Sequence, residues 1–145
     1  MQTFVPYGSN FRRNAEVLDR QRLGKQRVEA WQILKALTLP EYGWQSHPAV
    51  KMWRGHTEAL AEYGIVVCRE WIDRGYQDSL LEKFYPYLPS MQADLPEWLD
   101  REDVMLSHRS NLIRKFPEHY GLVWPDVPND LPYVWPVGPN ASLAH

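Results

Sequence analysis

The fold is decided by residues 19–37, whose sequence is DRQRLGKQRVEAWQILKAL. Apolar side chains recur in this stretch at the spacing of an α-helix, and Asp19 is a suitable cap for the first turn. Pro40 and Gly43 follow the stretch, and both are residues at which helices commonly stop. The pattern therefore predicts a helix from about Arg20 to Leu37.

Two more long helices are predicted further along the chain. One runs from about Pro48 to Arg74, because proline suits the first turn of a helix and Gly75 suits the residue just past its end. A polar linker with Pro89 near its middle follows. The other helix covers Val104 to Lys115 and ends before Pro117, since proline disrupts a helix interior.

The amino-terminal residues are predicted to be irregular before a first short helix. Pro6 and Gly8 favour an extended lead-in with a turn. Ser9 or Asn10 is suited to cap a short helix that continues to Leu18. The lead-in can therefore fold the amino terminus back over the helix at residues 19–37.

The carboxyl-terminal residues are predicted to be extended, because six of the twelve prolines lie from Phe116 onward. Trp124, Tyr133 and Trp135 are expected to lay this tail over the helices. The sequence thus predicts an all-α fold, with three principal helices in a compact single domain of residues 1–145. An irregular proline- and aromatic-rich tail completes it.

The composition is that of a packed globular protein in the cytoplasm. Of 145 residues, 44% are hydrophobic and seven are tryptophan, which argues against disorder. No apolar run approaches the roughly 20 residues that span a bilayer, and the start does not resemble a signal peptide. Cys68 is alone in an apolar run, so a buried inert thiol is expected, and the histidines lack metal-ligand spacing. We therefore predict no metal and no other cofactor.

Charge is distributed unevenly although the formal net charge is −2. Residues 1–60 carry nine Lys and Arg against five Asp and Glu, a balance of +4. Residues 61–145 carry seven against thirteen, a balance of −6. The positively charged residues 1–60 are suited to orient the protein on an anionic partner. Two unevenly solvated faces explain the same charge distribution equally well.

One stripe of the helix at residues 19–37 collects polar side chains. Helical spacing places Arg22, Lys25, Gln26 and Glu29 within about 100° of one another. Apolar side chains occupy most of the remaining surface, so this stripe is expected to line a cleft. The alternative is an exposed ion pair between Lys25 and Glu29, one helical turn apart. Gly24 costs helix propensity, which indicates that a neighbour packs close to it.

Four segments of the chain resemble the pyrimidine-dimer DNA glycosylase family, the phage-type endonuclease V proteins. They occur in the same order as in the family and together span most of the chain. The segments are residues 18–29 (LDRQRLGKQRVE), 47–53 (HPAVKMW), 71–76 (WIDRGY), and 107–115 (SHRSNLIRK) with Tyr120.

The resemblance implies a compact helical fold and a combined glycosylase and abasic-site lyase. In such an enzyme the protein's own α-amine attacks the sugar carbon, expels the base and forms a Schiff base. A glutamate on the early helix assists, and arginines hold the phosphates. Glu29 matches the position of that glutamate, and Arg22 falls where the family has a basic residue, where it can contact a phosphate.

The nucleophile is where this chain departs from the phage enzyme, which exposes a threonine amine after removal of methionine. Here residue 2 is Gln2, whose size should block that removal, so the free amine is expected on Met1. An α-amine has a pKa near 8, against about 10.4 for lysine, so more of it is neutral at pH 7. Lys25 is the rival nucleophile if burial lowers its pKa. A third alternative is that Glu29 acts with water, or that activity has been lost.

Further candidates for substrate binding lie outside this helix. Arg109, Arg114 and Lys115 are expected to contact phosphates, with His108 beside them, unless they pair with the chain's carboxylates. His47 and His56 lie near the start of a predicted helix and either face the same cleft or serve an ordinary surface role. Most tryptophans are expected in the core, and Trp44 is the exception best suited to stack on a base.

These observations favour a DNA glycosylase, with abasic-site lyase activity, that acts on a damaged or modified base in duplex DNA. No membrane and no obligate protein partner are expected. The alternative is a catalytically silent module that binds nucleic acid or a nucleotide. The sequence pI of about 6.2 argues against efficient sliding on undamaged DNA, and so favours either a narrow substrate or the silent module.

Overall fold

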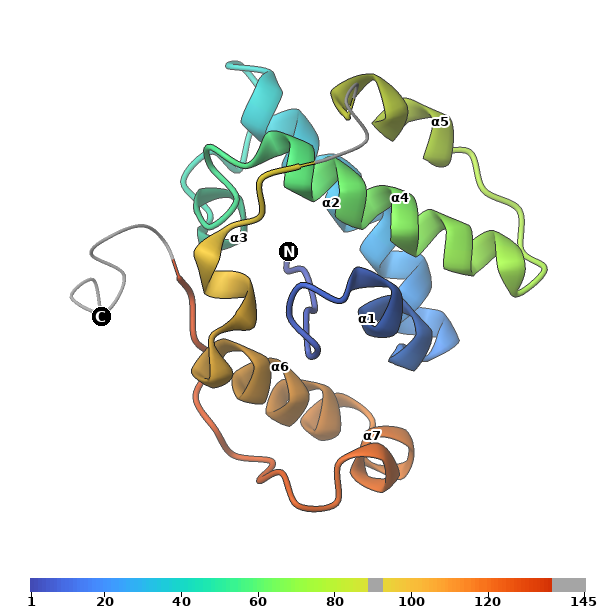
Figure 1. The fold of residues 1–145 in the computed structure, drawn as a ribbon, viewed down its shortest axis with the longest axis vertical. Helices are drawn as coiled ribbons and strands as arrows, with labels where there is room; N and C mark the ends of the chain where they lie inside the picture. The colour runs from blue at the N-terminus through green and yellow to red at the C-terminus, as the bar shows by residue number, and fades with distance from the viewer. Residues whose placement is uncertain (89–92, 137–145) are drawn as a thin grey trace.

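The computed structural model describes residues 1–88 and 93–136, and Figure 1 shows their arrangement. Helices account for all the regular structure in these two ranges, which contain no strand, so the predicted all-α class is confirmed. The α-helices are α1 (Phe11–Val17), α2 (Arg20–Thr38), α3 (Pro48–Lys51), α4 (Thr57–Asp73), α5 (Leu81–Phe84), α6 (Glu102–Lys115) and α7 (Pro117–Val123), and two 3₁₀ turns, η1 (Tyr85–Tyr87) and η2 (Glu97–Asp100), complete the list.

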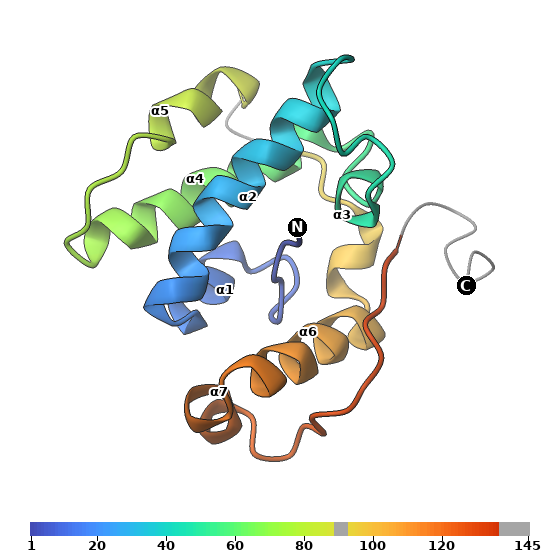
Figure 2. The ribbon, with the colours of Figure 1, turned by 180° about the vertical axis from the view of Figure 1, so that it is seen from behind.

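Two groups of helices enclose the core. Helices α2 and α4 pack side by side and α1 lies against α4, whereas α6 and α7 pack together at the other end of the molecule (Figures 1 and 2). The core between them holds large, fully buried side chains such as Trp53, Tyr63 and Leu112. None of the helices in the two ranges combines the length and the apolar character that crossing a membrane requires.

The amino-terminal lead-in is buried between the two groups of helices, where Figures 1 and 2 place the N-terminal label. Its backbone is held by side chains rather than by a strand partner. The Phe4 N–H donates to Gln26 Oε1 at 3.0 Å, and the Val5 N–H donates to His108 Nδ1 at 2.9 Å. Tyr63 donates to the Phe4 carbonyl at 2.9 Å. Side chains from α2, α4 and α6 thereby satisfy a buried backbone that would otherwise be destabilising.

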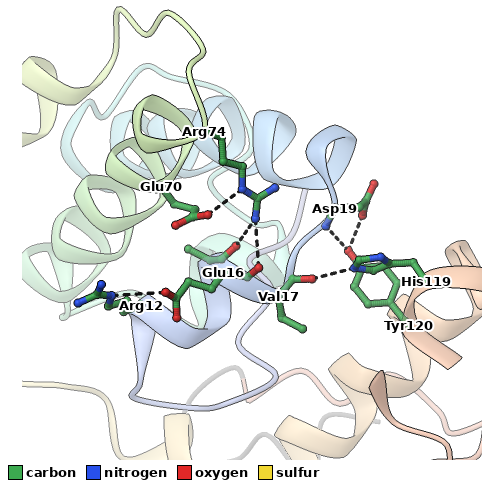
Figure 3. Close-up of polar contacts among 9 residues, drawn as sticks. Arg12, Glu16, Val17, Asp19, Glu70, Arg74, His119 and Tyr120 are labelled. Atoms are coloured by element: carbon green, nitrogen blue, oxygen red, sulfur yellow. Dashed lines mark hydrogen bonds and ion pairs between the residues drawn. The ribbon is translucent and has the colours of Figure 1, made fainter. Parts of the chain in front are cut away.

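The corner between α1 and α2 is fixed by contacts from α4 and α7, which Figure 3 shows. Arg74 pairs with Glu70 at 2.7 Å and also donates to two carbonyls at the end of α1. The Nε2 atom of His119 lies 3.1 Å from a third carbonyl oxygen at the end of α1, that of Val17. The Tyr120 hydroxyl accepts from the Asp19 N–H at 2.8 Å and donates to the Asp19 carboxylate. The start of α2 is therefore held in place by segments distant in sequence.

The two amino-terminal helices begin as predicted, with one difference at Asp19. The Asn10 side chain caps α1 by accepting from the Arg13 N–H, as expected. Asp19 precedes α2 but makes no capping bond to its backbone. Its carboxylate instead binds the Tyr120 hydroxyl and Arg22. Tertiary contacts have therefore replaced the local cap.

The prediction of one helix from Pro48 to Arg74 is wrong. Residues 52–56 form a turn that separates α3 from α4, and Gly55 adopts a left-handed backbone with φ of 86°. This turn buries Trp53 completely, with its ring 5.0 Å from that of Trp98. The periodicity of each half was helical, but the break depends on packing that the spacing does not reveal.

The prediction of an extended chain from Phe116 onward is also wrong in part. Pro117 opens the additional helix α7, where proline is tolerated at the first position because its missing N–H needs no partner. Residues 124–136 contain no helix, and this segment packs back on the molecule. The rest of the expected tail, residues 137–145, and the linker proline Pro89 lie outside the ranges described.

Candidate functional site

Gln26 connects the amino-terminal segment to Glu29. Its side chain is only 1% exposed, and its Nε2 donates to the Gln2 carbonyl at 3.1 Å and to Glu29 Oε2 at 3.0 Å. Its Oε1 accepts from the Phe4 N–H and, at 2.7 Å, from the Tyr63 hydroxyl, whose single proton is shared between this oxygen and the Phe4 carbonyl. All four hydrogen-bonding positions of the amide are therefore used. Helical spacing placed Gln26 beside Glu29 correctly, but it did not reveal that the amide is buried.

Glu29 lies where a small pocket meets a larger groove along α2. The pocket has a volume of about 60 Å³, and the groove about 860 Å³. A volume of the second size is typical of ligand-binding clefts. Gln21, Lys25 and Glu29 border both. The pocket is completed by Gln2, Phe4, Arg22, Gln26 and Lys115, and the groove by Asp19, Arg20, Gly24, Val28, Gln32, Trp71 and Phe116.

Three cationic side chains surround Glu29. Lys25 is exposed and makes no ion pair with Glu29 in the ranges described, so the alternative of a simple surface ion pair is not found. Arg22 pairs with Asp19 at 3.1 Å and donates to the Lys115 carbonyl at 3.3 Å. Lys115 itself lines the small pocket. The exposure of Lys25 also means that the burial required of a lysine nucleophile is absent.

Met1 lies at the start of the buried lead-in and is itself half-buried against the core. Its ammonium forms no ion pair with Glu29 in the described part of the chain. Burial, and then the positive charge of this ammonium, lowers the pKa of His47. The residue that follows Met1, Gln2, is tied to Glu29 through Gln26.

Because Gly24 has no side chain, Trp71 can pack directly on α2 and form one wall of the groove. A Cβ atom at this residue would lie 3.0 Å from Cη2 of Trp71, so the indole packs directly on α2. The Trp71 Nε1–H donates to the Gln77 carbonyl at 2.9 Å, and the Arg27 guanidinium lies 4.5 Å from the ring centroid. The predicted close neighbour of Gly24 is therefore confirmed. Val28, on the same helix, is 44% exposed and also lines the groove.

Two of the expected substrate-binding residues have structural contacts instead. His108 is fully buried, its ring stacks 5.0 Å from that of Tyr133, and burial lowers its pKa to about 3. Arg109 donates to the Pro6 carbonyl at 2.8 Å. Neither lines the pocket or the groove beside Glu29. Both side chains hold the amino-terminal lead-in against α6.

Arg114 likewise lies outside the cavities around Glu29. Its guanidinium donates to the carbonyls of Asn129 and Leu131 at 2.9 and 3.0 Å. It therefore anchors the segment after α7 to α6. We expected one cleft to be lined by Arg22, Lys25, Arg109 and Arg114. Of these four, only Arg22 and Lys25 line the cavities at Glu29.

His47 occupies the start of α3 and not the cavities at Glu29. Its Nδ1 accepts from the Ala49 N–H at 3.0 Å, which caps α3. The rings of Trp44 and Trp135 each lie 5.9 Å from its ring. His56 precedes α4 and borders a different cavity, together with Arg54. The two histidines are therefore not part of the Glu29 cleft.

The hydroxyl groups of Tyr63 and Tyr133 are buried, and neither residue was predicted to belong to the site. Burial, followed by the negative charge of Glu29, raises the pKa of both Tyr63 and Tyr133. Helical spacing does not reveal the role of Tyr63, because its bond to Gln26 joins residues 37 apart. In the two described ranges, no group of three or more His, Cys, Asp or Glu side chains is arranged to hold a metal ion.

Part of the chain matches the model of a known protein family. A family model described as pyrimidine dimer DNA glycosylase matches residues 1–83. This match covers α1 to α4 and therefore the lead-in, Arg22, Lys25, Gln26 and Glu29. Neither the curated proteins nor the solved structures contain a significant match to the chain.

Proposed function

The chain belongs to the pyrimidine dimer DNA glycosylase family, and from this premise we propose that it excises a damaged pyrimidine at Glu29 and then cleaves the abasic site. The observation that supports this assignment is the Gln26 amide, which holds the carbonyl of Gln2 and the carboxylate of Glu29 on one side chain. An amine one residue before Gln2 is thereby kept in the neighbourhood of a carboxylate.

In the proposed reaction the neutral amine of Met1 attacks the sugar carbon that carries the damaged base. The bond from that carbon to the base breaks, and the base leaves with the electron pair and takes up a proton. Loss of a proton from nitrogen and opening of the sugar ring give the imine. The Glu29 carboxylate stabilises the positive charge that develops on the sugar and accepts the proton removed in the later elimination.

The cations beside Glu29 are proposed to bind the DNA backbone. Arg22, Lys25 and Lys115 place positive charge around the small pocket, where a phosphate gains a charge-assisted hydrogen bond. The groove along α2 is proposed to accept the DNA segment that carries the lesion. Lys25 is assigned to binding rather than to imine formation because it is exposed.

Borohydride trapping tests this proposal directly. The untagged protein is incubated with duplexes that contain a pyrimidine dimer, an abasic site or no lesion, and borohydride reduces any imine to a stable adduct. We expect adducts with the first two duplexes only. Acetylation of the amino terminus should abolish them, and Glu29→Gln should lower turnover by several orders of magnitude. Lys25→Ala should weaken binding but still form the adduct.

The same assay separates the alternatives. An adduct that survives acetylation and disappears in Lys25→Ala would assign the nucleophile to Lys25. An untagged protein that binds the lesion duplexes but forms no adduct would be a catalytically silent binding module. Circular dichroism of each variant excludes loss of the helical fold as the cause of a negative result.

A further inference from the structure

Trp44 is an exposed aromatic residue in an unusual backbone conformation. Its side chain is 59% exposed, and its φ of 71° lies in the left-handed region. Within residues 1–88 and 93–136 it is the only residue other than glycine with a positive φ. Such a conformation is unfavourable for a bulky residue and persists only where the surroundings enforce it. Packing in the core does not explain an indole that is mostly in solvent.

The loop around Trp44 is held by side chain-to-backbone hydrogen bonds. Gln45 Nε2 donates to the carbonyls of Leu39 and Tyr42 at 2.9 and 3.2 Å. Arg54 donates to the Gln45 carbonyl at 2.9 Å. The loop therefore presents the indole of Trp44 in a defined position, as a preorganised contact requires.

Trp44 is one end of an aromatic shelf that we define as Trp44, His47 and Trp135. Their rings follow one another at 5.9 Å, and the Trp135 ring lies 4.4 Å from that of Tyr133. Tyr133 in turn stacks on His108, whose Nδ1 accepts from the Val5 N–H of the lead-in. The shelf therefore adjoins the lead-in that Gln26 ties to Glu29.

Positive charge accompanies the shelf. Arg54 contacts the residue that follows Trp44, and Lys51 lies one helical turn after His47, on the same face of α3. Both cations are exposed, and neither joins an ion pair in the parts of the chain that the structure describes. Aromatic rings beside cations that can follow a phosphate backbone are the usual surface for unstacked bases.

We propose that Trp44 stacks against an unpaired nucleobase of the substrate DNA, next to the sugar that reacts at Glu29. The proposal rests on the proposed function, because the shelf gains its role from adjoining that site. A lesion that disrupts pairing leaves a base free to leave the helix stack, and the indole face offers it a replacement stacking partner. Stacking on an aromatic side chain does not depend on the identity of the base. Trp44 would thereby favour distorted over regular duplex.

Photocrosslinking tests the contact in the intact protein. Duplexes carry 5-iodouracil opposite or beside an abasic site, and the crosslinked peptide is identified by mass spectrometry. We expect the adduct on Trp44 and a loss of crosslinking in Trp44→Ala. Affinity for the abasic duplex should fall about tenfold or more in Trp44→Ala and recover largely in Trp44→Phe. Leu122→Ala, at an 83% exposed residue on α7, is the matched control and should change neither readout.

Two further results decide between a structural and a binding role. Trp44→Gly relieves the left-handed backbone, so it should unfold at a temperature no lower than that of the unchanged protein, and it should lose the crosslink. A marked fall in unfolding temperature, or crosslinks confined to other residues, would overturn the proposal. Borohydride trapping by the unchanged protein on the same duplex tests the proposed function separately. A borohydride adduct without a Trp44 crosslink would contradict only the proposed role of the aromatic shelf. A Trp44 crosslink without a borohydride adduct would contradict only the proposed enzymatic activity.

Discussion

The Nε2 atom of Gln26 donates a hydrogen bond to Oε2 of Glu29 over 3.0 Å. The two residues are three positions apart on α2, so helical geometry brings them to the same face. The buried partner is an amide, which can donate to the carboxylate and to the Gln2 carbonyl while accepting from Phe4 and Tyr63. A carboxylate at the same position would lack both donors.

Replacing Gln26 by Glu should therefore lower the free energy of unfolding by at least about 2 kcal/mol. The new side chain would place a second carboxylate beside Glu29 and leave the Gln2 carbonyl without its donor. Urea denaturation measures the change. Gln21→Glu is the control, because Gln21 borders the same cavities but is exposed. Equal stability of the two variants would show that the buried amide does not have the partners assigned to it.

Salt dependence should separate the cations that bind DNA from those that hold the fold. Lys25→Ala removes one proposed phosphate contact, so the slope of log affinity against log salt concentration should become shallower by about 0.9. Arg114→Ala should leave that slope unchanged, because its guanidinium is engaged with the carbonyls of Asn129 and Leu131. Fluorescence anisotropy across a salt series gives both values. If the slope is unchanged in Lys25→Ala, Lys25 does not contact a phosphate.

Acidification should destabilise the protein through His108. Burial lowers the pKa of His108 to about 3 in the folded state, against about 6.5 for an exposed histidine. Between these values the unfolded chain binds the additional proton, so stability is fully present above pH 6.5 and is lost as the pH falls towards 3. The expected loss from this residue is about 2 kcal/mol between pH 7 and pH 5.

The control for this effect is His108→Gln, which retains an acceptor for the Val5 N–H. Denaturation of both proteins at pH 7 and pH 5 gives the comparison. The variant should show a smaller loss over this range, whatever its absolute stability. Parallel losses in the two proteins would assign the pH dependence to other groups.

Two glycines within helices should respond in opposite directions to alanine. At Gly64 on α4 a Cβ atom would lie 2.4 Å from Cε1 of the buried Phe84, so Gly64→Ala forces the ring or the helices apart. We expect a net loss of about 1–3 kcal/mol, which exceeds the gain in helix propensity. Gly121 on α7 has open space at the same position, so Gly121→Ala should stabilise by up to about 1 kcal/mol. Thermal denaturation distinguishes the two, and a stabilising Gly64→Ala would contradict the packing of Phe84.

Most of the correct structural predictions depend on residues that lie close together in the sequence. The bounds of α2 and α6 follow from helical periodicity and from the residues that end helices, and Pro48 does open a helix. The polar stripe with Lys25 and Glu29 follows from the same periodicity. The break at Gly55 and the additional helix after Pro117 were not predictable in this way. Both depend on which side chains the rest of the molecule buries.

The sequence by itself determined the all-α class, the extent of α2 and the position of Glu29 on it, because helix periodicity and family motifs are local properties of the chain. Only the tertiary structure decided that the lead-in is buried and that His108 supports it instead of binding substrate. The bond from Val5 to His108 spans 103 residues, and that from Phe4 to Gln26 spans 22. A buried N–H must find an acceptor somewhere, but no local pattern specifies which distant side chain supplies it.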